Sequence, residues 1–293
     1  MTGPAARPVR EVPVLIGGDE MARIDEAAQS LGLTADALME SAGAAVAEIA
    51  MVELTALAET ARGPGGPLAE PPLTVIFCGP GNNGGDGFVA ARRLAAAGRP
   101  TIAVLVGDGG RIGGAAAAHN WGVLQAMASG GSLQVFVAPT PELLLQLRPR
   151  LSPASLLIDA LLGSGASGPL REPISSAVDL MNAIRTHAVA AGRPCRVLSV
   201  DTPTRIDLTD GTRSDPVVTA DLTVTFHRAK AGFALDPEAR RLAGRYFVAP
   251  IGIPTEAEDR IVPPDAVFPP ARITEVTWQE PGGAPGEGEP AVG

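Results

Sequence analysis

The stretch CGPGNNGGDG, residues 78–87, decides the fold of this chain. It stands between the apolar run LTVIFC at 73–78, which predicts a buried strand, and DGFVAARRLAAAG at 86–98, which predicts a helix. Its glycines at 79, 81 and 84 satisfy the pattern G-x-G-x-x-G, in which a loop without Cβ atoms brings backbone N–H groups close to a phosphate. We therefore predict a strand–loop–helix unit that carries a ligand site.

Four residues distinguish this loop from the glycine-rich loop of a plain dinucleotide-binding dehydrogenase. Pro80 removes an N–H donor, and Asn82 and Asn83 place two amides where a phosphate otherwise meets bare backbone. Asp86 stands at the predicted start of the helix, where it caps the helix but repels a pyrophosphate. We expect a ligand that contacts amides and a carboxylate as well as a phosphate. A glycine turn with an Asp cap and no ligand is the alternative.

Short apolar runs alternate with Ala-rich stretches over most of the chain. Further strands are predicted for TIAVLV (101–106), LQVFVA (133–138), SLLIDALL (155–162), RVLSVD (196–201), LTVTF (222–226) and RYFVAP (245–250). Helices are predicted at 19–31 and 35–62 and between the strands. Strands that are apolar on both sides and separated by helices indicate a parallel sheet. We predict an α/β fold: a Rossmann-like, doubly wound, mostly parallel sheet flanked by helices, in a single domain.

The domain is predicted over residues 14–255, between an N-terminal lead at 1–13 and a Pro/Gly-rich, largely disordered tail at 256–293. A net charge of −9 argues against nucleic-acid and membrane partners. No apolar run approaches the roughly 18 residues of a membrane span, and two cysteines are too few for a disulfide framework. We expect a cytoplasmic protein. Lys230, the single lysine among 23 basic residues, needs an explanation.

Five segments in order resemble one known family. GPGNNGGDGFVAARRLAAAG is similar to the signature of the NAD(P)H-hydrate epimerase family, also called the YjeF N-terminal domain. The other four are MARIDEAAQSLGLTADALMESAG, LLIDALLGSGASGPL, VLSVDTPTRIDLTDG and ADLTVTFHRAKAGF. Together they span about residues 14–254, nearly the whole predicted domain.

The resemblance implies an isomerase that interconverts the S and R epimers of hydrated NADH or NADPH. This damage product carries a hydroxyl on C6 of the reduced nicotinamide ring, so the carbon is a hemiaminal. Once an acid protonates the hydroxyl, the ring nitrogen expels it, and water returns to either face of the planar iminium. Catalysis needs a proton-transfer group and support for a transient cation, but no redox cofactor. The resemblance also implies a separate ADP- or ATP-dependent dehydratase in the same pathway, and a homodimer.

The resemblance assigns substrate contacts to three segments. They are Asn82, Asn83, Gly84, Gly85 and Asp86; Gly163, Ser164, Gly165, Ala166, Ser167, Gly168 and Pro169; and Asp201. Asp201 ends a strand at the carboxyl edge, where ligands bind in open parallel sheets. We expect Asp201 to be the acid–base group, and an Asp that caps a turn is the alternative.

Asp159 interrupts an apolar strand, and a buried carboxylate needs a cation or several hydrogen bonds. The resemblance implies one potassium ion per subunit, held by Asn83, Asp159 and Thr204, whose oxygen donors suit a hard cation. The family carries Pro-Ser-Gly where this chain has Pro203-Thr204-Arg205. Arg205 either crowds the ion or contacts the substrate phosphate.

Lys230 follows the strand LTVTF within FHRAKAG, where the family carries Lys-Pro-Gly. We predict that it is catalytic, by holding the nucleotide phosphate or by assisting proton transfer, and a structural role is the alternative. His227, three residues earlier, is close enough to the predicted site to be a candidate, but it is interpreted as a surface or satisfied histidine.

Two other functions stay open. A catalytically silent nucleotide-binding or scaffold module of the same fold is favoured by Arg205. An NAD-linked oxidoreductase would use the literal G-x-G-x-x-G, with Asp108 as the ribose-binding acid.

Overall fold

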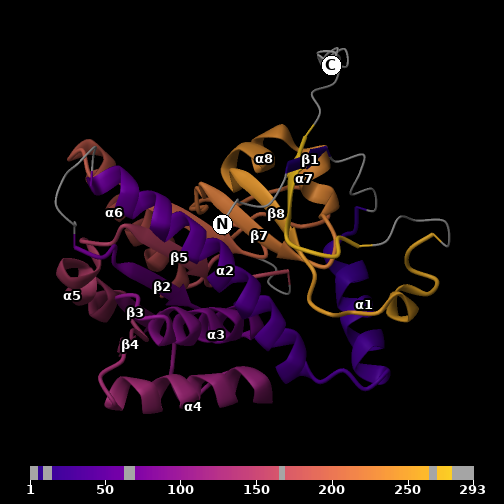
Figure 1. The fold of residues 1–293 in the computed structure, drawn as a ribbon, viewed down its shortest axis with the longest axis horizontal. Coiled ribbons are helices and arrows are strands. Elements are labelled where there is room, and N and C mark those ends of the chain that lie inside the picture. Colours follow the sequence, from indigo (N-terminus) through magenta and orange to yellow (C-terminus); the bar gives the residue numbers. More distant parts are fainter. Residues whose placement is uncertain (1–5, 9–14, 63–69, 165–168, 264–268, 279–293) are drawn as a thin grey trace, which may run out of the picture.

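A computed structural model describes residues 6–8, 15–62, 70–164, 169–263 and 269–278, and structural statements below concern these residues. It confirms the predicted α/β class (Figure 1). The described residues form one nine-stranded sheet in the order β1-β9-β8-β7-β6-β5-β2-β3-β4. The strands are β1 (Ala6–Pro8), β2 (Thr74–Cys78), β3 (Thr101–Leu105), β4 (Gln134–Val137), β5 (Leu156–Ala160), β6 (Arg196–Val200), β7 (Leu222–Phe226), β8 (Arg245–Ala249) and β9 (Thr274–Thr277).

The strand order reverses direction at β2. The chain runs from β2 outward through β3 to β4 and then crosses back to β5 on the other side of β2. All pairs from β4 to β8 are parallel, so their carboxyl ends share one edge. Ligands of doubly wound sheets bind outside the carboxyl ends at such a reversal, which here lies between β2 and β5.

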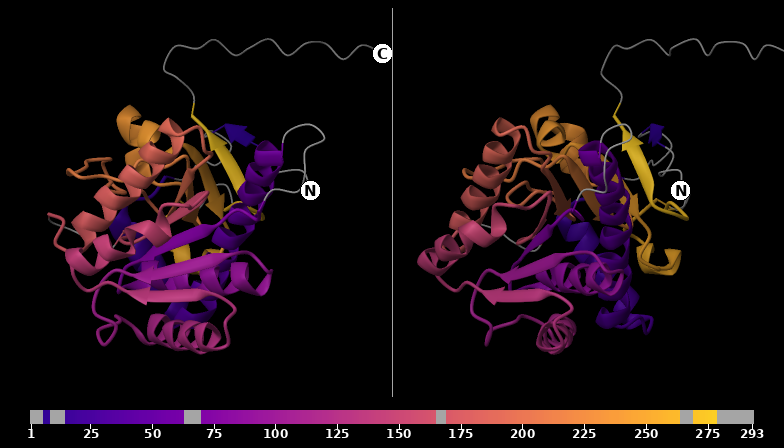
Figure 2. Two further views of the ribbon diagram at one scale, coloured as in Figure 1. Left: turned by 90° about the vertical axis from the view of Figure 1, so that its left-hand side faces the viewer. Right: turned by 60° about the vertical axis from the view of Figure 1, so that its left-hand side comes forward.

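Two helical layers cover the sheet (Figure 2). One face is covered by α1 (Gly18–Ser30), α2 (Ala35–Arg62), α3 (Asn82–Ala96) and α4 (Ala115–Ser129), and the other by α5 (Pro141–Leu151), α6 (Ile174–Ala190), α7 (Ala231–Leu235) and α8 (Pro237–Ala243). Alternate residues of a strand point to opposite faces. In β2, Ile76 and Cys78 therefore join the first core, whereas Val75 and Phe77 join the second.

Helix α2 is long and apolar enough, by length and composition, to cross a membrane over Ala35–Ala61. However, 56% of its most apolar 18-residue window is buried inside the structure. Ala45, Val46, Ile49 and Leu54 belong to the first core. A core helix passes the same test, so this single helix is weak evidence for a span.

The sheet includes strands outside residues 14–255, the range predicted for the domain. Strand β9 pairs antiparallel with β8 and parallel with β1, so residues from both predicted flanks join the sheet (Figure 2). The 3₁₀ helix η2 (Thr255–Glu258) buries Glu258, which accepts hydrogen bonds from Arg228 and contacts His227 Nε2 at 2.8 Å. His227 is thus a satisfied, buried histidine, as interpreted, and burial lowers its pKa to about 4. Residues 279–293 lie outside the described residues.

Candidate functional site

A cavity of about 720 Å³ lies at the carboxyl edge of the sheet, beside the reversal in strand order. Its volume is in the range of small-molecule sites. Loops after β2, β5 and β6 line one side, and helices α1 and α2 line the other. The lining side chains with chemistry to offer are Asp25, Glu26, Gln29, Asn82, Asn83, Asp86, Ser164 and Asp201.

Glycines let the loop after β2 pack against the loop after β5. A Cβ on Gly79 would lie 1.9 Å from the Leu161 carbonyl oxygen, and one on Gly84 would lie 1.8 Å from the Gly79 carbonyl oxygen. Gly84 and Gly85, two of the predicted contact residues, are buried and do not line the cavity. They shape the loop because no larger residue fits.

Helix α3 begins earlier than predicted. Gly81 is its N-cap and Asn82 its first residue, so Asp86 lies in the helix and not at its cap. The alternative of a glycine turn with an Asp cap is therefore wrong. Asp86 is 9% exposed and faces the cavity, and no described group donates a hydrogen bond to its carboxyl. Burial and the nearby carboxylates of Asp201 and Asp25 raise its pKa well above the usual range.

Asn83 is 92% buried and lines the cavity, and its Nδ2 has no hydrogen-bond partner among the described residues. A Cβ on Gly163 would lie 3.1 Å from Asn83 Oδ1 and 3.3 Å from Asp201 Oδ2. Gly163 thus stands between the amide and the carboxylate. An orphaned amide N–H group is costly unless a ligand accepts its hydrogen bond.

Asp201 follows β6 with a positive φ of 64°, a strained conformation for a residue with a Cβ atom. Its Oδ1 accepts a hydrogen bond from Thr225 Oγ1 (3.0 Å), and its Oδ2 accepts one from the Ser164 N–H (3.2 Å). Three elements therefore hold one carboxylate at the cavity wall. Such strain is typical of functional sites that the surrounding structure holds in place.

Lys230 lies next to Asp201 but does not line the cavity. It is fully buried, and its Nζ donates to Thr225 Oγ1 (2.9 Å), the Phe226 carbonyl (2.8 Å) and the Arg228 carbonyl (2.9 Å). Nζ is also 3.9 Å from Asp201 Oδ1. Burial lowers the pKa of Lys230, and the Asp201 charge opposes this shift. The expectation that Lys230 holds a phosphate is corrected, because all three N–H donors are occupied inside the protein.

Asp25 of α1 is a cavity residue that the sequence reasoning missed. Burial raises its pKa to about 6, the Lys230 charge lowers it, and the Asp201 charge raises it further. A local signal existed, because Asp25 lies between Met21 and Ala28 on the buried face of α1. A carboxyl on an apolar helix face needs an explanation.

Asp159, at the third position of β5 after Leu156, is fully buried and accepts four hydrogen bonds. The donors are Leu161 N (3.2 Å), Thr204 N (2.8 Å), Thr204 Oγ1 (2.6 Å) and Ser199 Oγ (3.0 Å). Within the described residues no cation pairs with it, and no group of three His, Cys, Asp or Glu could hold a metal. Asp159 and Thr204 meet as predicted, and their oxygens with the Asn83 amide offer hard donors for a monovalent cation.

Arg205 has a φ of 84°, where the family's glycine is unstrained. Its Nε donates a hydrogen bond to Ser214 Oγ (2.7 Å), and Arg205 does not line the cavity. The side chain therefore neither blocks the cavity nor reaches into it.

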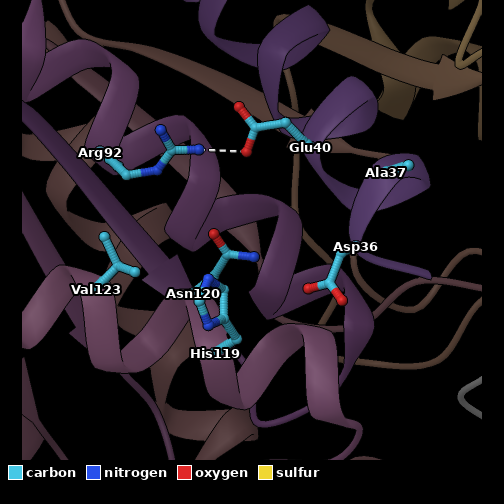
Figure 3. Close-up of a pocket in the computed structure, with 7 residues that line it drawn as sticks. All are labelled: Asp36, Ala37, Glu40, Arg92, His119, Asn120 and Val123. Atoms are coloured by element: carbon cyan, nitrogen blue, oxygen red, sulfur yellow. Dashed lines mark hydrogen bonds and ion pairs between the residues drawn. The ribbon is translucent and has the colours of Figure 1, made fainter. Parts of the chain in front are cut away.

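A second hollow of about 570 Å³ lies among α2, α3 and α4 (Figure 3). Glu40 and Arg92 point toward each other across it and form an ion pair, while Asp36 and His119 lie on its far side. It is away from the strand ends and contains none of the predicted site residues. We place the site in the larger cavity.

The predicted set divides into three groups. The cavity is lined by Asn82, Asn83, Asp86, Gly163, Ser164 and Asp201. The predicted residues that do not line it are Gly84, Gly85, Asp159, Pro169, Thr204 and Lys230. The residues outside the described part of the chain are Gly165, Ala166, Ser167 and Gly168. The loops at the sheet edge thus supply the expected amides and carboxylates, and α1 adds Asp25.

A doubly wound sheet with a cavity at its reversal point, lined in part by amides and carboxylates, defines a Rossmann-like α/β protein. The chain belongs to the family described as YjeF-related protein N-terminus, whose model matches residues 35–232. The predicted resemblance is confirmed.

Two relatives are similar to the chain in sequence, and one solved structure shares its fold. It is 39% identical to the bifunctional NAD(P)H-hydrate repair enzyme Nnr of Methanothermobacter thermautotrophicus, covering 86% of this chain and 43% of the relative. It is 35% identical to the NAD(P)H-hydrate epimerase of Cenarchaeum symbiosum, covering 83% and 97%. The crystal structure of yeast YNL200c shares the fold, with a TM-score of 0.68, 21% identity and coverage of 89% and 99%. The chain thus spans less than half of the bifunctional relative.

Proposed function

We propose that this protein is an NAD(P)H-hydrate epimerase, which interconverts the S and R epimers of hydrated NADH and NADPH. One observation carries the proposal: the Asn82 and Asn83 amides and the Asp201 carboxylate face a single cavity at the reversal of the sheet. The match over 97% of the length of a relative named NAD(P)H-hydrate epimerase supports it.

The proposed roles follow from position. Asp201 transfers protons at the C6 hydroxyl, and its negative charge stabilises the transient iminium cation. Asn82, Asn83, Asp86 and Ser164 contact the substrate. Lys230 acts through Thr225, whose hydroxyl accepts from Nζ and donates to Asp201, so the lysine is a positioning residue in this proposal.

We also propose that Asn83, Asp159 and Thr204 hold one potassium ion. A fully buried carboxylate with no cationic partner among the described residues supports this assignment. When bound, the ion would neutralise Asp159 and attract oxygen atoms of the substrate. The test is a potassium-dependent rise in melting temperature that sodium does not reproduce and that Asp159→Asn abolishes.

A separate ADP- or ATP-dependent dehydratase is the proposed pathway partner. Relatives named bifunctional are more than twice as long as the matched segment, which is consistent with a second activity outside it. A homodimer and a cytoplasmic location stay predictions. The alternative of a catalytically silent module was favoured by Arg205. Because Arg205 does not enter the cavity, it no longer supports that alternative.

The proposal predicts catalysed epimerisation. Purified protein is incubated with the S-enriched hydrate, and the R epimer is followed by chromatography against the spontaneous rate. We expect R formation well above that rate, and a loss of roughly 100-fold in Asp201→Asn, a usual size for acid–base catalysis. Asp179→Asn, an exposed aspartate of α6, is the matched control. A folded wild-type protein that does not exceed the spontaneous rate contradicts the proposal.

A further inference from the structure

Backbone pairing holds α1 against the site. The Ile16 N–H donates to the Ala229 carbonyl (3.1 Å), and the Ala231 N–H donates to the Ile16 carbonyl (3.0 Å). Ile16 therefore pairs with Lys230, the residue behind Asp201, and α1 begins two residues later. Met21, Ile24 and Ala28 anchor the same helix in the core. The position of Asp25 at the cavity wall is fixed by both attachments.

Asp25 and Asp201 differ in what surrounds them. Asp201 accepts two hydrogen bonds and has Lys230 beside it. No described group donates a hydrogen bond to the Asp25 carboxyl, which is partly buried beside like charges. Carboxyl groups whose environments differ in this way divide acid and base roles between them.

The orphaned Asn83 amide points independently to a ligand here. Its Nδ2 is buried, has no partner among the described residues and belongs to the wall of the same cavity. The cavity is thus built to receive a hydrogen-bond acceptor, and the Asp25 carboxyl faces whatever occupies it.

We propose that Asp25 is a catalytic residue, the proton donor to the departing C6 hydroxyl, while Asp201 accepts the proton of the returning water. The inference rests on the proposed epimerase function. It explains why a carboxyl group lies on the buried face of α1, among Met21, Ile24 and Ala28.

The step balances in atoms and charge. Asp25 gives its proton to the hydroxyl, the C6–O bond breaks, and water leaves as the ring nitrogen lone pair forms the C=N bond. Water then adds to the other face of C6, and its surplus proton passes to Asp201. Exchange with solvent returns the proton from Asp201 to Asp25, and no oxidant or reductant takes part.

The charges that face Asp25 set the pH at which it can donate. Burial and like charge raise its pKa to about 6, near the working range of a general acid. The nearby charges are those of Asp86 of α3, Asp201 after β6 and Lys230 after β7. Glu26 of α1 lines the same cavity, and η2, which packs against α1, carries Glu258 with its partners Arg228 and His227. Because the protonated form is the active one, wild-type kcat/KM should decline as pH rises above about 6.

The test compares Asp25→Asn with Asp19→Asn, an exposed aspartate on the same helix that does not line the cavity. We expect kcat to fall roughly 100-fold in Asp25→Asn with KM within about threefold, and no change in Asp19→Asn. The melting temperature of Asp25→Asn should equal or exceed that of wild type at pH 7 to 8, because a neutral amide avoids the burial of a charge. A merely structural Asp25 would show the opposite change in stability.

A second variant guards against a folding defect. Asp25→Ala should regain at least tenfold in rate when cacodylic acid is added, because this small acid has a pKa near that of Asp25 and can enter the open cavity. Equal rates for Asp25→Asn and Asp19→Asn in an active enzyme overturn this inference alone. An inactive, folded wild type overturns the proposed function and the inference together. Loss of activity in Asp25→Ala without rescue by cacodylic acid also contradicts proton donation.

Discussion

Two buried carboxyl groups near the same edge of the sheet have opposite surroundings. Asp159, in β5, is fully buried and accepts four hydrogen bonds. Asp86, in α3, is 9% exposed, and no described group donates to it. Burial raises the pKa of both, but hydrogen bonds oppose the shift at Asp159, whereas like charges add to it at Asp86. The protein supplies four hydrogen bonds to the Asp159 carboxyl, whereas the described residues supply none to the Asp86 carboxyl, which faces the cavity.

Removal of the Asp159 carboxyl group should have the largest effect on stability. Asp159→Ala leaves four buried donors without an acceptor, and unsatisfied buried groups cost about 1–3 kcal/mol each before the structure relaxes. We expect a loss of about 3–5 kcal/mol in the free energy of unfolding, measured by urea denaturation. Asp179→Ala, at an exposed position of α6, should change it by less than about 0.5 kcal/mol. A loss below about 1 kcal/mol at Asp159 would remove the distinction between the two carboxyls.

The same Asp→Asn change should have opposite signs at the two positions. The folded-state pKa of Asp86 is raised above its unfolded value of 3.8, so its contribution is most favourable at low pH and is lost as pH rises. Asp86→Asn should therefore stabilise the protein by about 0.5–2 kcal/mol at pH 7 to 8, with a smaller gain at pH 4. Asp159→Asn should destabilise it, because its new NH₂ group faces donors. Melting curves from pH 4 to 8 measure the stability of both variants. Destabilisation by Asp86→Asn would contradict the proposed difference between the two carboxyl groups.

The smallest effect is expected beside the Asp159 network. Arg205→Gly relieves a positive φ, a gain of about 1 kcal/mol, but removes the hydrogen bond to Ser214, a loss of similar size. The free energy of unfolding should change by less than about 1 kcal/mol, and the epimerase rate by less than about threefold. A tenfold change in rate would mean that Arg205 reaches the substrate.

Much of the fold could be predicted because its signals are local. Apolar runs such as LTVIFC and SLLIDALL mark strands buried on both faces, and the glycine loop marks the first strand–helix turn. The burial of Asp159 could also be predicted, because a carboxyl group in an apolar strand must find hydrogen-bond donors, which Thr204 supplies. The start of α3 was misplaced, since a helix cap depends on backbone geometry that the residue pattern does not specify.

The sequence alone predicted the order of strands and helices along the chain, the sheet edge where the cavity lies, and three residues that line it, Asn82, Asn83 and Asp201. The order of elements follows from periodicity, and the edge follows from the rule that ligands meet the carboxyl ends of parallel strands. The three residues follow from the resemblance to the family. Only the tertiary structure decided that Asp25 joins them, that Lys230 lies behind Asp201, and that β9 extends the sheet. Each depends on contacts between segments far apart in the chain. Such contacts are set by how helices and strands pack together and leave no mark on any local pattern.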